Sequence, residues 1–487
     1  MQSEGLQPNL VGRLVVVSNR APFRILHEAG RRRVEPTVGG LATTFLHLLE
    51  KHGGLWVAWS GGTETPNRLD LSEKHPPFSI VFIGLSERQI SQYYWNMCNR
   101  GLWPLMHSMP FKCDFGPSDW ECYREVNQRF ARSCSEQLQI NDTVWIQDFH
   151  LALLPGLLRQ AVTDRPIGLF WHVPFPSGAI LSRLPWSQEL LRGMLGSDLI
   201  GFHTAAYASN FLDCCQQVLG LRVDRENGYV FHDVGTTKVG AYPIGVPVDY
   251  FQGLRDDPKV IRRLARITRT VNVERIILGV DRVDYTKGLP ERLRGYERFL
   301  EQNPQYHKRV TLVQIAVPSR TRVPEYRALT RQVEALVADI VTRFSIEGWL
   351  PIRYLYKQYD PEVLVAYYLA AHVALITPLV DGMNLVAKEY VATHTGDDGV
   401  LILSEFAGAA VELKEALLVN PYDVDQIAQQ LKCALEIDEG ERRRRMRALR
   451  AAVEESTLTR WSQAFLEELQ AARESTQARH DPPREMS

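Results

Sequence analysis

The sequence predicts an α/β protein made of two units, each a parallel β-sheet covered by helices. Short runs rich in Val, Ile and Leu recur without strict alternation, as is typical of strands buried on both faces. Longer helical patterns, such as 324–344 and 423–435, lie between these runs. The alternation recurs in both halves of a 487-residue chain, a length that allows two or three domains, so we expect two α/β units.

The expected strands divide into two groups at a Pro- and Gly-containing segment, 242–247, which marks the predicted domain boundary. Beyond about Glu474 the chain is polar and carries two prolines, which predicts a frayed tail. The strands of the first group cover 14–18, 80–85, 144–147, 167–171 and 199–202, and those of the second cover 276–280, 310–316, 352–356, 373–376, 400–403 and 416–419.

Composition excludes several classes of function. The 56 Lys and Arg residues against 57 Asp and Glu give a net charge of −1, so neither a nucleic acid nor a membrane is an expected partner. The seven cysteines are odd in number and form no C-x-x-C pair, which favours reduced thiols over disulfides or zinc. Since the first residues contain no apolar leader segment, we expect a cytoplasmic protein.

Polar residues follow several strands of the first half. Open α/β sheets bind ligands beyond the carboxyl ends of their strands, and Arg20, Asp148 and His172 stand at such ends. Gly39 and Gly40 precede a helical pattern, where backbone N–H groups could approach a phosphate. A plain turn at the glycines, and structural roles for a single Asp or His, remain alternatives. On their own, Tyr94 and Trp103 fit aromatic core residues better than ligand contacts.

The second half carries a cationic loop after the strand 276–280. Arg282 and Lys287 stand just before Gly288 and a helical pattern, where two positive charges could neutralise a diphosphate leaving group. The spacing does not match a Walker loop. Surface charges in a loop between a strand and a helix are the alternative interpretation.

A second loop follows the strand 373–376. Asp381 precedes a turn with Gly382, and residues 383–385 could offer backbone N–H groups at a helix N-terminus. Glu389 falls about one turn after Leu385, on nearly the same helical face. One acidic side chain could bind sugar hydroxyls and the other a ribose, although an ordinary core helix would also explain the pattern.

Together these segments resemble the trehalose-6-phosphate synthase family of retaining glycosyltransferases. The resemblance covers about 13–470 and implies the GT-B fold, two Rossmann-like domains that face a central cleft. The matching segments are Ser18-Asn19-Arg20, Gly39-Gly40-Leu41, Tyr94 with Leu102-Trp103-Pro104, 145–150, 172–176, 281–292, 318–320 and 381–390.

The resemblance implies transfer of glucose from a nucleotide-diphosphate glucose to glucose 6-phosphate with retention of configuration, giving α,α-trehalose 6-phosphate. It implies an acceptor domain at 1–246, a donor domain at 247–455, and at 456–487 a helix that packs back on the first domain before the tail. The implied acceptor residues are Arg20, Tyr94, Trp103, Asp148 and Arg320; the implied donor residues are Gly39, Gly40, His172, Arg282, Lys287, Tyr359, Asp381, Gly382, Met383, Asn384, Leu385 and Glu389. Arg282, Lys287, Asp148 and His172 are the implied catalytic residues.

Neither a cofactor nor a metal is expected. No acidic residue is clearly placed as a covalent nucleophile, so we expect the departing phosphate to accept the acceptor's proton while Arg282 and Lys287 stabilise its charge. An Asp-x-Asp does occur at Asp423 and Asp425, but it opens a helix, and helix capping is the expected role.

Several alternatives stay open at this point. A glucosylglycerol-phosphate synthase would use glycerol 3-phosphate as acceptor, and a catalytically silent protein would only sense sugar phosphates. UDP-glucose is the expected donor, with GDP- and ADP-glucose as alternatives, because Tyr359 is expected to contact the base through its backbone. The family commonly has His where this chain has Gln147. The insertion 21–38 could form a flap over the acceptor, and its role is otherwise open. We expect a homo-oligomer. Because this chain has no Asp-x-Asp-x-Thr phosphatase signature, we expect a separate trehalose-6-phosphate phosphatase. The physiological role of the trehalose is open.

Overall fold

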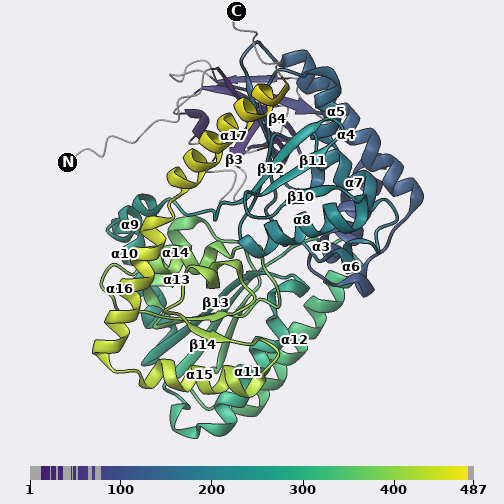
Figure 1. Ribbon diagram of the computed structural model, residues 1–487. Helices are drawn as coiled ribbons and strands as arrows, with labels where there is room; N and C mark the ends of the chain where they lie inside the picture. The colour runs from purple at the N-terminus through teal and green to yellow at the C-terminus, as the bar shows by residue number, and fades with distance from the viewer. Residues whose placement is uncertain are drawn as a thin grey trace, which may run out of the picture. The chain divides into compact units, whose positions relative to one another are not determined.

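The computed structural model describes residues 12–21, 23–28, 31–36, 45–46, 48–50, 53–63, 68–71 and 78–480. They form two compact units (Figure 1). Unit 1 contains the described residues up to Pro243 together with those from Trp461 onward, and unit 2 spans Ile244–Arg460. Each unit contains one large β-sheet, so the predicted α/β class with two parallel-sheet units is confirmed.

Unit 1 is built on a ten-stranded sheet of order β10-β11-β12-β9-β8-β7-β1-β4-β6-β5. Its central strands are parallel, and Val16 of β1 faces Trp56 of β4 on one side and Trp145 of β7 on the other. Strands β2 (Phe23–Glu28) and β3 (Arg31–Pro36) form a separate antiparallel hairpin in the insertion. The strands of the sheet are β1 (Leu14–Arg20), β4 (Gly54–Trp59), β5 (Arg68–Leu71), β6 (Phe78–Ile83), β7 (Thr143–Gln147), β8 (Ile167–Phe170), β9 (Leu199–Phe202), β10 (Arg222–Asp224), β11 (Tyr229–His232) and β12 (Gly235–Ala241).

Helices connect these strands. A capping box at Ser86 starts α2 (Glu87–Gln89), which continues directly into a π-helix, Ile90–Leu102. π-Helical segments are rare and often occur at functional sites. The other helices of unit 1 that precede the crossing to unit 2 are α3 (Trp103–Met106), α4 (Pro117–Gln137), α5 (Leu154–Ala161), α6 (Gly178–Leu181), α7 (Ser187–Met194) and α8 (Ala205–Leu219).

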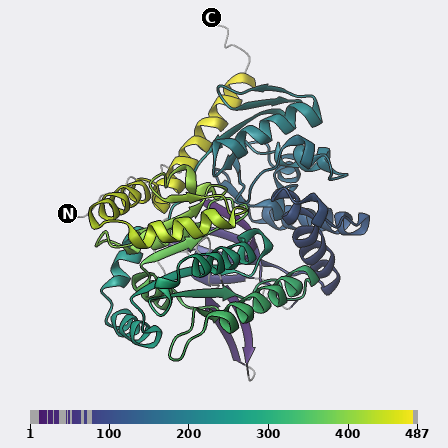
Figure 2. The same cartoon turned by 90° about the horizontal axis from the view of Figure 1, so that it is seen from below.

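The last helix, α17 (Leu458–His480), completes the core of unit 1. The Trp145 ring centroid lies 5.0 Å from that of Trp461 and 4.8 Å from that of Phe465. Gly168 of β8 and Gly201 of β9 leave room for this contact, because an added Cβ would lie 2.8 Å and 2.7 Å from ring carbons of Phe465. In Figure 1 and Figure 2 the yellow helix α17 runs along the strands of unit 1.

Unit 2 contains a six-stranded, all-parallel sheet of order β15-β14-β13-β16-β17-β18. The inner strands are mostly apolar and buried, as their sequence predicts, whereas β15 and β18 at the edges are partly exposed. The strands are β13 (Arg275–Arg282), β14 (Val310–Val317), β15 (Ile352–Leu355), β16 (Val373–Ile376), β17 (Val400–Ser404) and β18 (Leu417–Val419).

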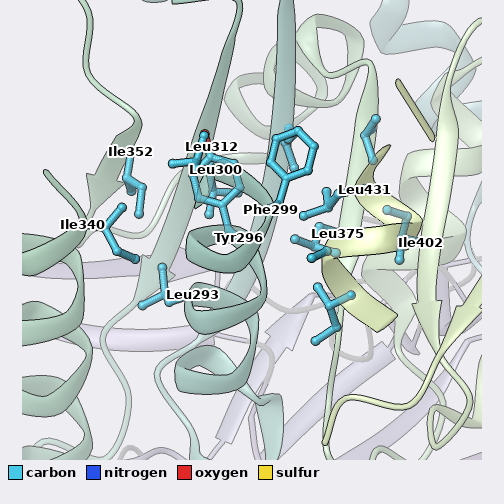
Figure 3. Close-up of a cluster of buried hydrophobic side chains, with 14 of the residues drawn as sticks. Leu293, Tyr296, Phe299, Leu300, Leu312, Ile340, Ile352, Leu375, Ile402 and Leu431 are labelled. Atoms are coloured by element: carbon cyan, nitrogen blue, oxygen red, sulfur yellow. The ribbon is translucent and has the colours of Figure 1, made fainter. Parts of the chain in front are cut away.

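One face of this sheet packs on α11, α12 and α15. Figure 3 shows Tyr296 and Phe299 of α11 beside Leu312, with Ile340 of α12 and Leu431 of α15 completing the same buried cluster. The helices of unit 2 are α9 (Val248–Arg255), α10 (Pro258–Val271), α11 (Leu289–Gln302), α12 (Pro324–Phe344), α13 (Pro361–Ala370), α14 (Leu385–Thr393), α15 (Val424–Glu436) and α16 (Glu439–Glu455).

The structure corrects parts of the predicted element list. Strand β4 lies outside the expected strands, although its apolar run with two Trp and Val57 is typical of a buried strand. The β10–β12 edge was also missed, because its strands are mostly half-exposed and carry no apolar run. The segment from Glu474, where a frayed tail is predicted, is helical as far as His480, where α17 ends, and the residues beyond lie outside the described part of the chain. The capping role of Asp423 is confirmed: its side chain accepts the Gln426 N–H at 2.9 Å.

Candidate functional site

In both sheets several of the predicted site residues, such as Arg20, Asp148 and Arg282, stand at the ends of strands at the point where the strand order reverses. This point lies between β1 and β7 in unit 1 and between β13 and β16 in unit 2. Open α/β sheets bind ligands outside the carboxyl ends of their strands at such points. The fold therefore gives each unit its own candidate half-site.

In unit 1, Arg20 lies at the carboxyl end of β1 between aromatic rings. Its guanidinium carbon is 4.2 Å from the Trp59 ring centroid and 4.7 Å from that of Tyr94. Gly61 has φ +96°, and a Cβ there would lie 2.2 Å from Nη1 of Arg20, so glycine makes room for the guanidinium. Cation–π contact holds the cation in place. The structure thus brings Arg20 and Tyr94 together and adds Trp59, which the sequence reasoning missed.

Asp148 and His172 meet at the ends of β7 and β8. The backbone N–H of His172 donates to Oδ1 of Asp148 at 3.2 Å, and Asp148 has φ 70°, a conformation that L-residues rarely adopt. The ring Nε2 of His172 lies 2.9 Å from Oε1 of Gln147. Burial lowers the pKa of His172 well below its usual value, and the nearby His203 lowers it further, so the imidazole is neutral. A strained backbone, as at Asp148, and a histidine with a strongly shifted pKa, as at His172, are typical of functional positions.

The remaining predicted residues of unit 1 have different surroundings. The Trp103 ring is buried, with its centroid 4.2 Å from that of His107. Tyr94 stacks on His150 at 6.2 Å between centroids. Gly39 and Gly40 lie outside the described residues.

In unit 2, the loop after β13 carries the predicted cationic pair. The side chain of Arg282 is 46% exposed, and its Nη2 lies 3.9 Å from Oδ2 of the buried Asp284. Nζ of Lys287 lies 2.5 Å from Oδ2 of Asp381. Two residues predicted to hold the same ligand, Lys287 and Asp381, are therefore in direct contact.

A backbone hydrogen bond joins the loop after β13 to the loop after β16 in unit 2. The N–H of Leu379 donates to the carbonyl of Thr286 at 2.7 Å. Gly288 has φ +63°, and a Cβ there would lie 2.2 Å from the carbonyl oxygen of Thr377, so both its conformation and its surroundings require glycine. The spacing between Lys287 and the 381–384 segment is consequently fixed by the fold.

Asn384 shapes the start of α14. It has φ 81°, its side chain accepts the Ala387 N–H at 3.1 Å, and its amide donates to Oδ2 of Asp381 at 3.0 Å. The carbonyl of Met383 accepts the N–H of Ala409 at 2.7 Å, which holds the segment against the loop after β17. Asn384 thus caps the helix and orients the Asp381 carboxylate.

Glu389 lies one turn into α14 and accepts a hydrogen bond from the Tyr368 hydroxyl at 2.7 Å. Burial raises the pKa of Glu389 above its usual range, and the hydrogen bond from Tyr368 opposes that shift. Tyr359 lies two residues before the start of α13, and its ring centroid is 5.7 Å from that of Tyr367. Leu385 is the first residue of α14, and its side chain is half-buried.

Arg320 follows β14 and is held by an ion pair. Its side chain is 8% exposed, and its Nη1 donates to Oδ2 of Asp284 at 2.8 Å and also contacts the Tyr326 hydroxyl. The residue has φ 47°, in the left-handed region that favours glycine. The position is therefore strained, and the contact with Asp284 stabilises it.

A fully buried arginine lies behind these loops. Arg292 pairs with Asp281 and donates to Oγ1 of Thr377 at 3.0 Å and to Oε1 of Gln314 at 3.1 Å. Sequence reasoning placed Arg292 within a matching segment but assigned it no role. The available signal in the sequence was the position of Arg292, a charged residue one turn after Leu289 on an otherwise apolar helical face.

The half-site of unit 2 can bind anions. Arg282, Lys287 and Arg320 present three cations near the ends of adjacent strands, with Asp284 and Asp381 as their counter-ions. Guanidinium and ammonium groups in such partly buried loops are suited to phosphate oxygens. Among the described residues, no group of three or more His, Cys, Asp or Glu side chains is arranged to hold a metal ion. No helix in the described part of the chain is both long and apolar enough to cross a membrane.

Comparison with known proteins gives consistent matches. The sequence pattern of glycosyltransferase family 20 matches residues 12–471. A bifunctional trehalose-6-phosphate synthase/phosphatase of Thermoproteus tenax is 38% identical over 95% of this chain, which spans 64% of that relative's length. The trehalose-6-phosphate synthase of Mycolicibacterium smegmatis is 39% identical, with 95% of this chain and 93% of the relative covered.

A solved structure extends these matches to the fold. The alpha,alpha-trehalose-phosphate synthase (UDP-forming) of Burkholderia xenovorans, in complex with glucose-6-phosphate, is 36% identical and superposes with a TM-score of 0.86. The match covers 94% of this chain and all of the other. Similarity at this level extends over both units rather than over one sheet.

Proposed function

Because the chain belongs to glycosyltransferase family 20, we propose that it is an α,α-trehalose-6-phosphate synthase. It transfers glucose from UDP-glucose to the anomeric hydroxyl of glucose 6-phosphate with retention of configuration. Relatives that carry this name match nearly the whole chain, and one of them holds glucose-6-phosphate. The observation on which the proposal chiefly depends is the group of three cations at the carboxyl ends of β13 and β14.

The proposed roles follow the sequence prediction residue by residue. Residues 1–246 form the acceptor domain and 247–455 the donor domain, with 456–487 returning to the first. The donor is held by Gly39, Gly40, His172, Arg282, Lys287, Tyr359, Asp381, Gly382, Met383, Asn384, Leu385 and Glu389, and the acceptor by Arg20, Tyr94, Trp103, Asp148 and Arg320.

In the proposed reaction the bond between the glucose C1 and the diphosphate oxygen breaks as a bond from C1 to the acceptor's anomeric oxygen forms on the same face. The acceptor's hydroxyl proton passes to the departing phosphate, which leaves as UDP. Arg282 and Lys287 stabilise the negative charge that develops on that phosphate. The neutral His172 ring contacts the donor sugar without adding a charge near C1.

Two cationic side chains at the leaving group supply the role that a metal plays in other transferases, so we propose a metal-independent reaction. We also propose that the enzyme is cytoplasmic, in keeping with its seven free cysteines, of which five are buried. We propose further that it forms a homo-oligomer, which light scattering of the purified chain would test. Trehalose 6-phosphate is the expected end product, its phosphate being removed by a separate phosphatase. Phosphate release from it by this chain would contradict that expectation.

The test crosses donors with acceptors. UDP-, GDP- and ADP-glucose are each incubated with glucose 6-phosphate and with glycerol 3-phosphate, with and without chelator, and products are identified by mass and NMR. The expected result is α,α-trehalose 6-phosphate from UDP-glucose, unchanged by the chelator. Product only with glycerol 3-phosphate would replace the proposal by glucosylglycerol-phosphate synthesis. Tight sugar-phosphate binding without any product would identify a silent sensor.

A further inference from the structure

Asp284 is a fully buried carboxylate in the middle of the cationic loop, with none of its side chain exposed. Its Oδ1 accepts both the backbone N–H and the hydroxyl of Thr286, each at 3.1 Å. Its Oδ2 accepts Nη1 of Arg320 at 2.8 Å and the Tyr326 hydroxyl at 3.1 Å. Oδ1 therefore stabilises the loop at Thr286, and Oδ2 holds the side chains of Arg320 and Tyr326.

The second oxygen is shared by two arginines. Nη2 of Arg282 lies 3.9 Å from the same Oδ2 that binds Arg320. Arg282 belongs to the carboxyl end of β13 and Arg320 follows β14, the neighbouring strand. A buried charge whose partners are removed is costly, so both guanidinium groups are held toward this carboxylate.

Arg320 depends on this contact more than Arg282 does. It has φ 47°, whereas Arg282 is in regular strand geometry and its side chain is 46% exposed. The Tyr326 ring lies 5.3 Å from the Arg320 guanidinium carbon, and its hydroxyl contacts both Arg320 and Asp284. These contacts form one network in which Asp284 is the common acceptor.

We propose that Asp284 is a positioning residue that orients Arg282 toward the donor diphosphate and Arg320 toward the acceptor phosphate. This inference rests on the proposed function, because it uses the two substrate phosphates assigned there. Since both arginines share one carboxylate oxygen, a single substitution at Asp284 affects the binding of both substrates. A residue with a purely structural role would lower stability and leave both affinities unchanged.

Asp284→Asn tests the proposal against a matched control, Asp142→Asn. Asp142 is also buried and also pairs with an arginine, Arg13, at 2.8 Å, but it lies in unit 1 outside every proposed contact. Binding of UDP and of glucose 6-phosphate is measured by calorimetry beside kcat, both KM values and the Tm. For Asp284→Asn we expect at least a tenfold weaker affinity for each ligand; for Asp142→Asn we expect a lower Tm with affinities within twofold of wild type.

A double-mutant cycle isolates the contact. Arg320→Ala should weaken glucose 6-phosphate binding at least tenfold in the wild-type background and less than threefold when Asp284 is already Asn. Should Asp284→Asn fail to fold, Tyr326→Phe removes one hydroxyl of the same network and should raise the KM for glucose 6-phosphate several-fold while the KM for UDP-glucose stays constant.

Ligand affinities that match wild type in Asp284→Asn, full additivity in the cycle, or an unchanged acceptor KM in Tyr326→Phe would each overturn the proposal. Because calorimetry reports binding without turnover, a wild-type protein that binds both ligands and makes no product would count against the proposed function alone. The positioning role would still be decided by the affinities.

Discussion

At the scale of single residues, the site is a set of charges that already satisfy one another. Lys287 contacts Asp381 at 2.5 Å, and Arg320 contacts Asp284 at 2.8 Å. Under the proposed assignment, a substrate phosphate competes with a carboxylate for each of these two cations. This arrangement keeps partly buried charges paired before substrate arrives, which avoids the cost of an isolated buried ion.

Loss of either donor-side cation should slow turnover. Arg282→Ala and Lys287→Ala are each expected to lower kcat about 100-fold, roughly 3 kcal/mol, because the leaving phosphate loses a stabilising charge. Arg294→Ala is the matched control: its side chain is 44% exposed, close to the 46% of Arg282, and it pairs with Glu291 of its own helix. Steady-state assays at saturating substrates measure the effect, and near-normal kcat in both variants would refute the donor-site assignment.

Loss of Arg320 should separate the two substrates. Arg320→Ala is expected to raise the KM for glucose 6-phosphate far more than the KM for UDP-glucose, since the guanidinium is assigned to the acceptor phosphate. The two KM values are measured by varying one substrate at saturating levels of the other. An unchanged acceptor KM would place the acceptor phosphate elsewhere.

Sequence reasoning found the residues that stand directly after apolar strands, because strand ends are marked by an abrupt change from apolar to polar. The pattern itself suggested a diphosphate for Arg282 and Lys287 and sugar or ribose hydroxyls for Asp381 and Glu389, and the other roles came from the resemblance to a family. Trp59 and Asp284 were missed for physical reasons. Trp59 is the last residue of β4, a strand that was not predicted, and Asp284 is one acid among several charges whose burial appears only once the loop is folded.

At the scale of elements, contacts between neighbouring strands decide how the sheet of unit 2 responds to pH. Nδ1 of His372, just before β16, accepts the N–H of Ile276 in β13 at 3.1 Å. Burial, followed by the charge of Arg275, lowers the pKa of His372 from 6.5 to about 4. A protonated ring could not accept this hydrogen bond, so the contact requires the neutral form.

The free energy of unfolding should therefore fall as the pH drops from 6.5 toward 4. The unfolded chain binds the His372 proton below pH 6.5 and the folded chain only near pH 4, so the stabilisation is complete above 6.5 and is lost on acidification. One such proton contributes at most about 1.4 kcal/mol per pH unit, and partial exposure of the ring reduces this.

Urea unfolding between pH 7 and 4.5 measures this slope. His372→Asn keeps an acceptor near the Nδ1 position but does not titrate, so it should reduce the slope without abolishing it, since burial also lowers the pKa of His172 and His232. Equal slopes in wild type and variant would assign the pH dependence to other groups.

The contact between α17 and the sheet of unit 1 should be equally specific. Gly201→Ala places a methyl group 2.7 Å from a ring carbon of Phe465 and is expected to cost about 1–3 kcal/mol of stability through overpacking. Gly253→Ala on α9 is the control, because no atom lies within 4 Å of the added Cβ; it should be neutral or stabilise by up to about 1 kcal/mol. Urea unfolding compares the two, and equal stabilities would show that α17 tolerates the added methyl.

At the scale of the whole molecule, the fold class was predictable because both sheets contain strands buried on both faces. The antiparallel edge of unit 1 was not, since half-exposed strands carry no continuous apolar signal. Strand β4 was missed although it is apolar and buried. The return of the last helix to unit 1 was expected only by resemblance. Its physical basis, the two glycines that receive Phe465, depends on residues about 260 to 300 positions earlier in the chain and leaves no local pattern.

That return sets an order of events on the ribosome. Unit 2 is continuous in sequence, so all of it has been synthesised once Arg460 has been added, whereas the sheet of unit 1 still lacks the helix that covers Trp145. At ordinary rates of translation the interval between Pro243 and Trp461 lasts roughly ten seconds or more. During this time the apolar face of a ten-stranded sheet remains uncovered by its own last helix, and exposed apolar surface of this kind is prone to aggregation until the helix is made.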